Sequence, residues 1–200
     1  MKRSLLLIAL TLGLIVTLSG CKSAPTEEIN MTTEALKAIE TADVNTYAPE
    51  SLKAAQEEMN KAMAEIKVQD EKFSLMRDYK PAVAMLKSTN ELAQKAQDEA
   101  VANKAKAKAE AEAIVAELPQ SLQEASDMLK KAPRGKDTKA DLEAMQSDLK
   151  LAEEAAAEAN SAVAAENYLD AIAKAKTTKE KAASIVDQVT SARQKLGRRG

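Results

Sequence analysis

The feature that most constrains this fold is a 3-4 spacing of apolar residues that recurs in three segments. The first segment has Leu52, Ala55, Met59, Ala62, Ile66, Phe73 and Met76, with Gln69 at the missing step. The second has Leu142, Met145, Leu149, Ala152, Ala156, Ala159 and Val163. The third has Tyr168, Ile172, Ala175, Ala182, Val186, Val189 and Leu196, interrupted by Lys179 and Arg193. A sustained period of about 3.5 residues indicates helices that pack along a coiled-coil seam.

The segments also align with one another, which predicts an internal duplication. Asp78–Ala96 superposes on Asn167–Ile185 at an offset of 89 residues, so that Tyr79 corresponds to Tyr168. The segments upstream of the two tyrosines align at an offset of 90. Each unit is therefore expected to be a helical hairpin, with a turn just before the tyrosine and a second helix that folds back.

Composition supports the same fold class. Alanine accounts for 40 of the 200 residues, together with many Glu, Lys, Gln and Leu, and this is typical of long helices and coiled coils. The one long alternating stretch, Lys104–Ala113, pairs alanine with charge and suits a solvated helix better than a strand. We predict an all-α fold of elongated antiparallel helical hairpins in a coiled-coil-like bundle.

Prolines and turn residues predict the boundaries of the helices. Pro49 and Pro81 suit the first turn of a helix, whereas Pro119 is expected to kink or restart one. Lys131–Thr138 is the clearest loop, because it combines proline, glycine and aspartate. Residues 26–45 and 119–132 either pack as short helices or stay loosely attached. The predicted organisation is a leader at 1–20, a tether at 21–26, a first hairpin unit at 27–118, a short helix and loop at 119–137, and a second hairpin unit at 138–200.

The first 20 residues have the layout of a bacterial export signal. Lys2 and Arg3 precede an apolar run from Leu5 to Leu18, as in a secretory signal peptide. This run is short for a membrane-spanning helix, which needs about 20 apolar residues. A cleaved leader is therefore favoured over a stop-transfer anchor.

The leader ends at Leu18-Ser19-Gly20-Cys21, which resembles the lipobox of bacterial lipoproteins. The resemblance implies that the signal peptidase recognises Leu18, Ser19 and Gly20 and cleaves before Cys21. It also implies that the Cys21 thiol carries diacylglycerol and that the new amine is acylated, for example with palmitate. Cys21 is the only cysteine, so a disulfide within the chain has no partner. An ordinary cleaved signal is the remaining alternative.

The residue after the cysteine is Lys22 rather than aspartate. By resemblance to the sorting pattern of enteric bacteria, this implies anchoring in the outer membrane, facing the periplasm. In an organism with a single membrane, the chain would face outward from the plasma membrane.

Three further stretches resemble a family of bacterial lipoproteins known by a domain of unknown function. They are Tyr47–Ala55, which reads YAP-x-x-L-x-x-A, and the segments around Tyr79 and Tyr168, which resemble the turn motif A-x-x-x-(D/N)-Y-x-x-A. The resemblance is strongest over residues 40–100. The hairpins also look like tetratricopeptide hairpins, but the 34-residue period is absent and the helices are longer. These resemblances imply a fold and a location, and no activity.

Residues that could carry chemistry are scarce. The chain has no histidine, which excludes histidine-based catalysis and histidine metal ligands. No glycine loop for phosphate and no calcium-loop spacing is found. Without Lys2 and Arg3, 27 basic side chains remain against 31 acidic ones, a formal charge of −4, which argues against nucleic acid as a partner. We expect no enzyme activity, cofactor or metal.

Two sets of residues are candidate contact sites. The first is Tyr47, Tyr79 and Tyr168, which are expected to pack at the hairpin ends, with stacking on a ligand or sugar as the alternative. The second is the basic C-terminal tail, with Arg193, Lys195, Arg198 and Arg199. These cations complement the end of a helix, or they contact anionic lipid or cell-wall polymer.

The expected function is that of a membrane-anchored envelope lipoprotein that acts as a helical spacer or as a docking scaffold. Its partners would be the membrane, through Cys21, and either another envelope protein or a second copy of the chain. One alternative is a lipoprotein that binds a lipid or another apolar ligand, with a lining of Met31, Met59, Met63, Met76 and Met85. Another alternative is non-covalent binding to the cell wall.

Overall fold

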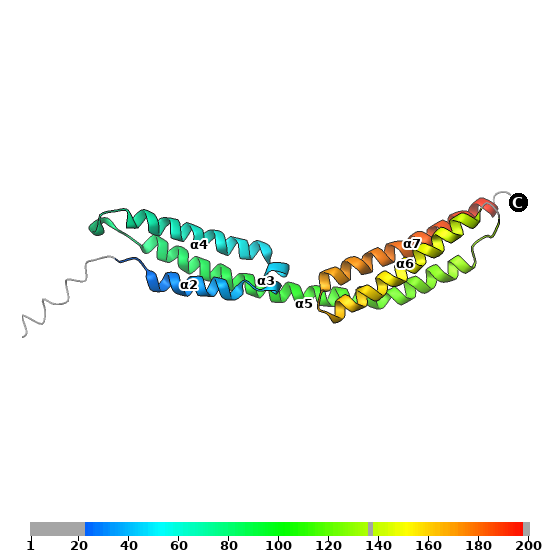
Figure 1. Cartoon of the computed structure of the whole chain (residues 1–200), viewed down its shortest axis with the longest axis horizontal. Coiled ribbons are helices and arrows are strands. Elements are labelled where there is room, and N and C mark those ends of the chain that lie inside the picture. The colour runs from blue at the N-terminus through cyan, green and yellow to red at the C-terminus, as the bar shows by residue number, and fades with distance from the viewer. Residues whose placement is uncertain (1–22, 136–137, 198–200) are drawn as a thin grey trace, which may run out of the picture. The chain divides into compact units, whose positions relative to one another are not determined.

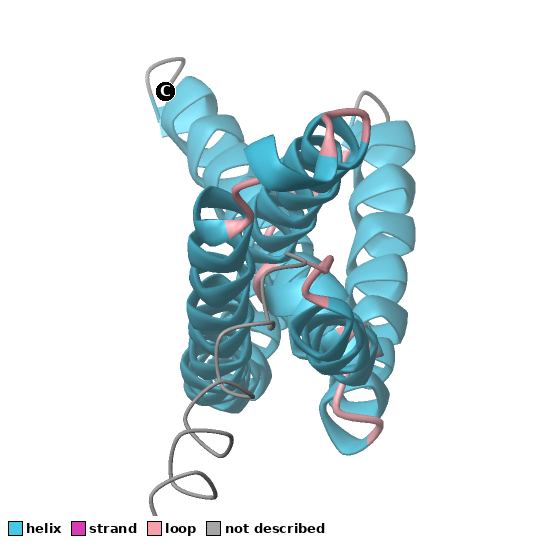
Figure 2. Ribbon diagram, turned by 90° about the vertical axis from the view of Figure 1, so that its left-hand side faces the viewer, coloured by secondary structure: helices cyan, strands magenta, loops and turns pink. Residues whose placement is uncertain are grey.

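The computed structural model describes residues 23–135 and 138–197 (Figure 1). These residues form only helices and loops, as Figure 2 shows. The helices are α2 (Thr26–Ile39), α3 (Ala42–Tyr47), α4 (Pro49–Asp70), the 3-10 helix η1 (Ser74–Met76), α5 (Lys80–Lys130), α6 (Lys139–Ala164) and α7 (Tyr168–Gly197). The predicted all-α fold is confirmed. Within the described ranges, no helix is both long enough and apolar enough to traverse a bilayer.

The chain divides into two compact units, Met1–Asn103 and Lys104–Gly200, and α5 contributes a segment to each. The boundary predicted at residue 118 therefore falls inside the second unit. The reason is that α5 is one continuous helix, so no loop marks the change from one core to the next.

The first unit packs α2, α4 and the first part of α5 side by side (Figure 1). Ile29 of α2 joins the buried cluster around Tyr79, and the hydroxyl oxygen of Thr32 accepts a hydrogen bond from the Asn90 side chain at 3.0 Å. Because later residues of α2 contact later residues of α5, the two helices are parallel. The α4 helix is antiparallel to both, since Ser51 near its start donates to Glu99 late in this part of α5.

The second unit repeats this arrangement with the last part of α5, α6 and α7. Val115 and Leu118 of α5 pack with Ala159 of α6 and Ala175 of α7. A second cluster along the same helices contains Leu129 and residues of both partners, among them Met145, Ala182, Ile185 and Val189. Each unit is thus a three-helix bundle in which the first and third helices are parallel.

Positions that correspond in the two units are buried in both, which supports the predicted duplication. Thr89 and Thr178 are both fully buried, and each hydroxyl donates to the carbonyl four residues earlier at 2.9 Å. This local bond satisfies a polar group that would be costly to bury alone. Other buried pairs at the offset of 89 are Tyr79 and Tyr168, Ala82 and Ala171, Leu86 and Ala175, Ala93 and Ala182, and Ala96 and Ile185.

The prediction of two-helix hairpins was incomplete, because a third helix completes each core. In the first unit this helix is α2, which buries Thr32, Leu36 and Ile39. In the second unit it is the last part of α5, which buries Ala125 and Leu129. Two alanine-rich helices bury little apolar area between them, at about 25 cal/mol per Å². A third helix covers the side of the seam that a hairpin would leave in water.

Of the two alternatives predicted for Pro119, a restarted helix is wrong, because Pro119 lies inside α5. Its ring is exposed, while Leu118 beside it is buried and Leu122 packs on the same cluster. An interior proline costs a helix about 3 kcal/mol. Packing of the apolar side chains on both sides of Pro119 outweighs that cost, so the predicted short helix at 119–137 is the end of α5.

Candidate functional site

The most distinctive surface of the described residues is the loop between α4 and α5, residues 71–79. Here Phe73, Leu75 and Met76 are 71%, 74% and 73% exposed. We call these three residues the apolar triad and residues 71–79 the α4–α5 loop. The 3-4 spacing predicted that Phe73 and Met76 lie on the buried seam, and this prediction was wrong, because α4 ends at Asp70. Leu75 was missed, and the spacing held no signal for it, since apolar residues also stand directly before seam positions within continuous helices, for example Leu151 before Ala152.

Polar side chains hold both ends of this loop. The Arg77 side chain donates to the carbonyl oxygens of Lys72 and Asp70, at 3.0 and 2.9 Å. Buried Gln69 accepts a hydrogen bond from the backbone N–H of Asp78 at 2.9 Å. The loop is therefore closed by polar contacts at its base, and the apolar triad takes no part in them.

Tyr79 lies where the loop enters α5. Its ring is buried with Ile66, Ala82 and Ala24, and its hydroxyl donates to the Asp70 carboxylate at the end of α4. The pKa of the Tyr79 hydroxyl is raised above its ordinary value, first because of this hydrogen bond to a carboxylate and then because of burial. Tyr79 thus joins α4, α5 and the start of the described chain.

A groove of about 890 Å³ lies beside Tyr79, between the residues that begin α2 and those that begin α5. Ala24, Pro25, Val83 and Ala84 supply its apolar lining. Charged side chains from both helices also line it, among them Glu27, Glu28, Lys80 and Lys87. The chain therefore emerges from residues 1–22 at the same end of the first unit as the α4–α5 loop (Figure 1).

The corresponding joint of the second unit is much shorter. Residues 165–167 connect α6 to α7, and Glu166 adopts a left-handed conformation with φ of 60°. The N–H of Asn167 donates to Ala162 O at 2.9 Å and that of Glu166 to Val163 O at 3.0 Å. This is the hydrogen-bond pattern of a Schellman cap. Three residues thus suffice to connect these helices.

The three tyrosines are buried at different places. Tyr47 ends α3 rather than starting a helix, and its carbonyl oxygen accepts from the Asn103 side chain at 2.8 Å. Tyr79 directly precedes α5, and Tyr168 is the first residue of α7. All three are at most 8% exposed, so their rings offer little surface to a ligand.

The basic tail is only partly described. Arg193 donates from both Nε and Nη2 to the carbonyl oxygen of Lys131, at 3.3 and 2.9 Å, and so contacts the residue that follows α5. Lys195 lines a groove of about 830 Å³ along α6 and α7 that also contains Asp141, Glu180 and Asp187. Arg198 and Arg199 lie outside the described residues. Arg193 thus already has an acceptor from the protein itself.

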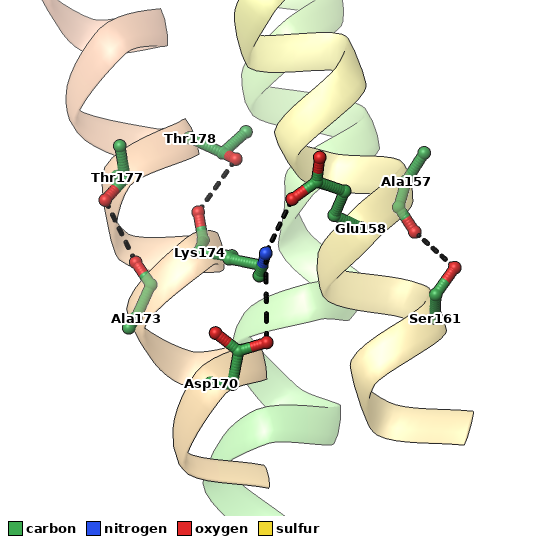
Figure 3. Close-up of polar contacts among 8 residues, drawn as sticks. All are labelled: Ala157, Glu158, Ser161, Asp170, Ala173, Lys174, Thr177 and Thr178. Carbon is green, nitrogen blue, oxygen red and sulfur yellow. Dashed lines mark hydrogen bonds and ion pairs between the residues drawn. The ribbon is translucent and has the colours of Figure 1, made fainter. Parts of the chain in front are cut away.

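Figure 3 shows the polar contacts between α6 and α7 near the second joint. Lys174 Nζ lies 2.5 Å from Glu158 Oε2 on α6 and 3.8 Å from Asp170 Oδ2 on its own helix. The hydrogen bond to Glu158 raises the pKa of Lys174 above its ordinary value. Such contacts join neighbouring helices at the surface, where ion pairs contribute little to stability.

The lipobox-like residues Leu18, Ser19, Gly20 and Cys21 lie outside the described residues, which begin two residues later at Ser23. Over the ranges that the structure describes, no three carboxylate side chains gather as they would around a metal ion. No protein-family model, curated protein or solved structure matches the chain.

Proposed function

We propose that this chain is a non-enzymatic lipoprotein of the bacterial envelope, anchored through Cys21 and acting as a helical spacer or docking scaffold. The observation that carries the proposal is the sequence Leu18-Ser19-Gly20-Cys21 behind a basic start and an apolar run. The resemblance to the lipoprotein family with a YAP-x-x-L-x-x-A start supports the same location.

The entry of the chain into the first unit is consistent with such an anchor. Ala24 packs against the cluster that contains Tyr79, so only a short stretch separates Cys21 from the folded bundle. A lipid on Cys21 would therefore hold one end of the first unit close to the membrane. Two or more acyl chains hold a protein stably, at about 0.8 kcal/mol per buried methylene.

The proposed mechanism is positional. The lipid fixes one end of the chain, and the helices present their surfaces to other envelope components. An α-helix rises about 1.5 Å per residue, and α6 has 26 residues, so a single bundle spans about 39 Å along its axis. Exposed apolar side chains on α2, α4 and α5, namely Met31, Met63 and Val101, provide points at which a partner helix could pack.

The alternatives have weaker support. Of the five methionines that would line a ligand site, Met31, Met63 and Met76 are exposed, while Met59 and Met85 pack on the cluster around Tyr79. The five therefore do not share one lining. Cell-wall binding through the tail has fewer free donors, because Nε and Nη2 of Arg193 already donate to the Lys131 carbonyl.

The anchor is tested by the mass of the N-terminal peptide and by incorporation of labelled palmitate in cells. We expect the wild-type peptide to begin at Cys21 and to carry diacylglycerol and an amide-linked acyl chain. Cys21→Ala should abolish the label and keep the leader, whereas Ser23→Ala should leave both unchanged. A wild-type peptide without lipid, or label that persists in Cys21→Ala, would refute the anchor.

The docking role is tested by photo-crosslinking in cells from probes placed at Met31, Met63 and Val101, with mass spectrometry of the adducts. One dominant protein adduct from one face is expected for a docking scaffold. Adducts with lipid or wall polymer alone would contradict docking and favour a ligand-holding or wall-binding lipoprotein.

A further inference from the structure

We propose that the α4–α5 loop is a second membrane contact, in which the apolar triad inserts into the interface of the bilayer that holds the lipid of Cys21. This inference rests on the proposed lipid anchor. The loop would give the first unit a fixed orientation on the membrane, which attachment through one residue alone does not provide.

The first argument is the exposure of the triad. Phe73, Leu75 and Met76 are each more than 70% exposed, and they lie within four consecutive residues. Single exposed apolar residues are common on protein surfaces, but a contiguous group marks a contact with a membrane or another protein. The triad belongs to none of the buried clusters described above. Packing in those clusters therefore does not explain why these three residues are apolar.

The second argument comes from the duplicated unit. The same joint is made there by residues 165–167, with no large apolar side chain among them. The helices α4 and α6 begin at equivalent positions, Pro49 and Lys139. However, α4 is about one turn shorter, and the residues that correspond to the last turn of α6 belong to the α4–α5 loop. Connecting the two helices therefore does not require a nine-residue loop with three exposed apolar side chains.

The third argument is the position of the anchor. Ser23 and Ala24 line the groove beside Tyr79. Tyr79 follows the last residue of the apolar triad, Met76, by three residues. Cys21 precedes Ala24 by three residues, and a residue spans at most about 3.6 Å, so its Cα lies within about 11 Å of that of Ala24. A lipid on Cys21 would therefore lie at the same end of the first unit as the triad, because Ser23 and Ala24 line a groove with Asp78 and Tyr79 of the α4–α5 loop.

The charges of the loop indicate which kind of membrane contact this is. Glu71 and Asp78 balance Lys72 and Arg77, and the Arg77 side chain is already bonded to two carbonyl oxygens. A neutral loop gains little from anionic lipid, in contrast to polybasic segments. The contact should therefore depend on apolar insertion and be insensitive to salt.

The test uses the full lipidated chain, purified from membranes, with Leu75→Cys labelled by an environment-sensitive nitrobenzoxadiazole probe. In the lipidated chain the Cys21 thiol is a thioether, so the new thiol alone reacts. The protein is reconstituted in vesicles of phosphatidylethanolamine and phosphatidylglycerol that contain a lipid with a nitroxide on its acyl chain. The matched control is Leu169→Cys, half-exposed at the equivalent joint of the second unit.

We expect a blue-shifted emission at position 75 and quenching by the nitroxide several-fold stronger than at position 169, at low and high salt alike. Equal, weak quenching at both positions in a lipidated chain would overturn the inference and leave the anchor intact. A blue shift without quenching would also overturn it, because a protein partner or a second copy would then cover the loop. An N-terminal peptide without lipid would refute the anchor itself, and with it this inference.

A second variant separates insertion from mere proximity to the lipid. Phe73→Ser with Met76→Ser should remove most of the quenching at position 75 while the helical content and the thermal unfolding temperature stay unchanged, since both side chains are exposed. Quenching that persists in this variant would overturn the inference, because the anchor alone would then bring the loop to the bilayer.

Discussion

At the scale of the residue, the two equivalent tyrosines differ in what their surroundings provide. Tyr79 donates its hydroxyl to Asp70. The residue of the second unit that corresponds to Asp70 is Asn160, whose amide instead donates to the Ala156 carbonyl within its own helix at 2.9 Å. The tyrosine–carboxylate bond therefore belongs to the longer joint, where it ties the end of α4 to the start of α5.

Tyr79→Phe should lower stability at neutral pH and weaken its dependence on alkaline pH. The bond to Asp70 raises the pKa of the folded-state hydroxyl. Its stabilisation is thus fully present below the unfolded pKa of about 10, and it is lost as the pH rises through the raised folded pKa. Urea unfolding at about pH 8 and about pH 11 measures this. Tyr168→Phe is the control, and equal pH slopes for wild type and Tyr79→Phe would contradict the role of the bond.

Glu166→Gly should be more stable than Glu166→Gln by roughly 0.5–1 kcal/mol, because the two variants lose the same charge and only the glycine relieves the strain. A non-glycine residue in the left-handed region costs about 1–2 kcal/mol. Glycine removes this strain but has more conformational entropy in the unfolded state, which reduces the stabilisation. Loss of the surface pair between Glu166 and Lys104, 2.9 Å apart, subtracts at most about 1 kcal/mol. The control Glu166→Gln removes the charge and keeps the strain. In urea unfolding, a Glu166→Gly variant that is no more stable than Glu166→Gln would contradict the strain assigned to Glu166.

At the scale of the element, packing rather than local propensity sets where the helices end. The α5 helix continues through Pro119, which by itself favours a break. The α4 helix ends at Asp70 although apolar residues continue the 3-4 spacing beyond it. In the first case the packing of buried Leu118 and partly buried Leu122 favours the helix. In the second the contacts of Gln69, Arg77 and Tyr79 favour a loop.

Pro119→Ala should raise the free energy of unfolding by roughly 1–3 kcal/mol, because it restores a backbone donor and removes the ring from the preceding turn. The side chain is exposed, so the substitution leaves no cavity. The midpoint of urea unfolding, at an unchanged slope, measures the gain. Gln120→Ala, at the exposed neighbouring position, should shift the midpoint little, and an equal shift for both variants would contradict the cost assigned to the proline.

At the scale of the whole molecule, the two units have cores made from different residues. The cluster around Tyr79 contains residues of the first unit only, and the two clusters along α6 and α7 contain residues of the second unit only. Damage to one core should therefore affect its own unit first, since local opening follows the contacts that are lost.

Ala152→Asp should place a charge in the second core, because Ala152 is fully buried, and should cost that unit about 3 kcal/mol or more. Hydrogen exchange should show lost protection in α6 and α7, with α2 and α4 less affected. Ala157→Asp, exposed on the same helix, should leave the protection nearly unchanged. Unchanged thermal unfolding of Ala152→Asp, or an equal loss in both units, would contradict the separate cores.

The sequence by itself determined the fold class, the turns before Tyr79 and Tyr168, and most positions of the seam. These follow from local rules, since the spacing of apolar residues and the place of prolines act within a few turns of one helix. The equivalence of the two units could also be predicted, because it follows from aligning the sequence with itself. The lipobox resemblance of residues 18–21 stays a prediction, as do the docking role and the location.

Only the tertiary structure decided which segments complete the cores and which apolar residues stay outside them. Residues 26–39 and the end of α5 become third helices because the alanine-rich seams leave surface to cover. Pro119 is carried inside a helix, and Phe73 and Met76 leave the seam, because contacts between helices outweigh local preference there. The apolar triad could not be found from spacing alone, since its exposure results from hydrogen bonds that Gln69, Arg77 and Tyr79 make only when α4 and α5 lie side by side.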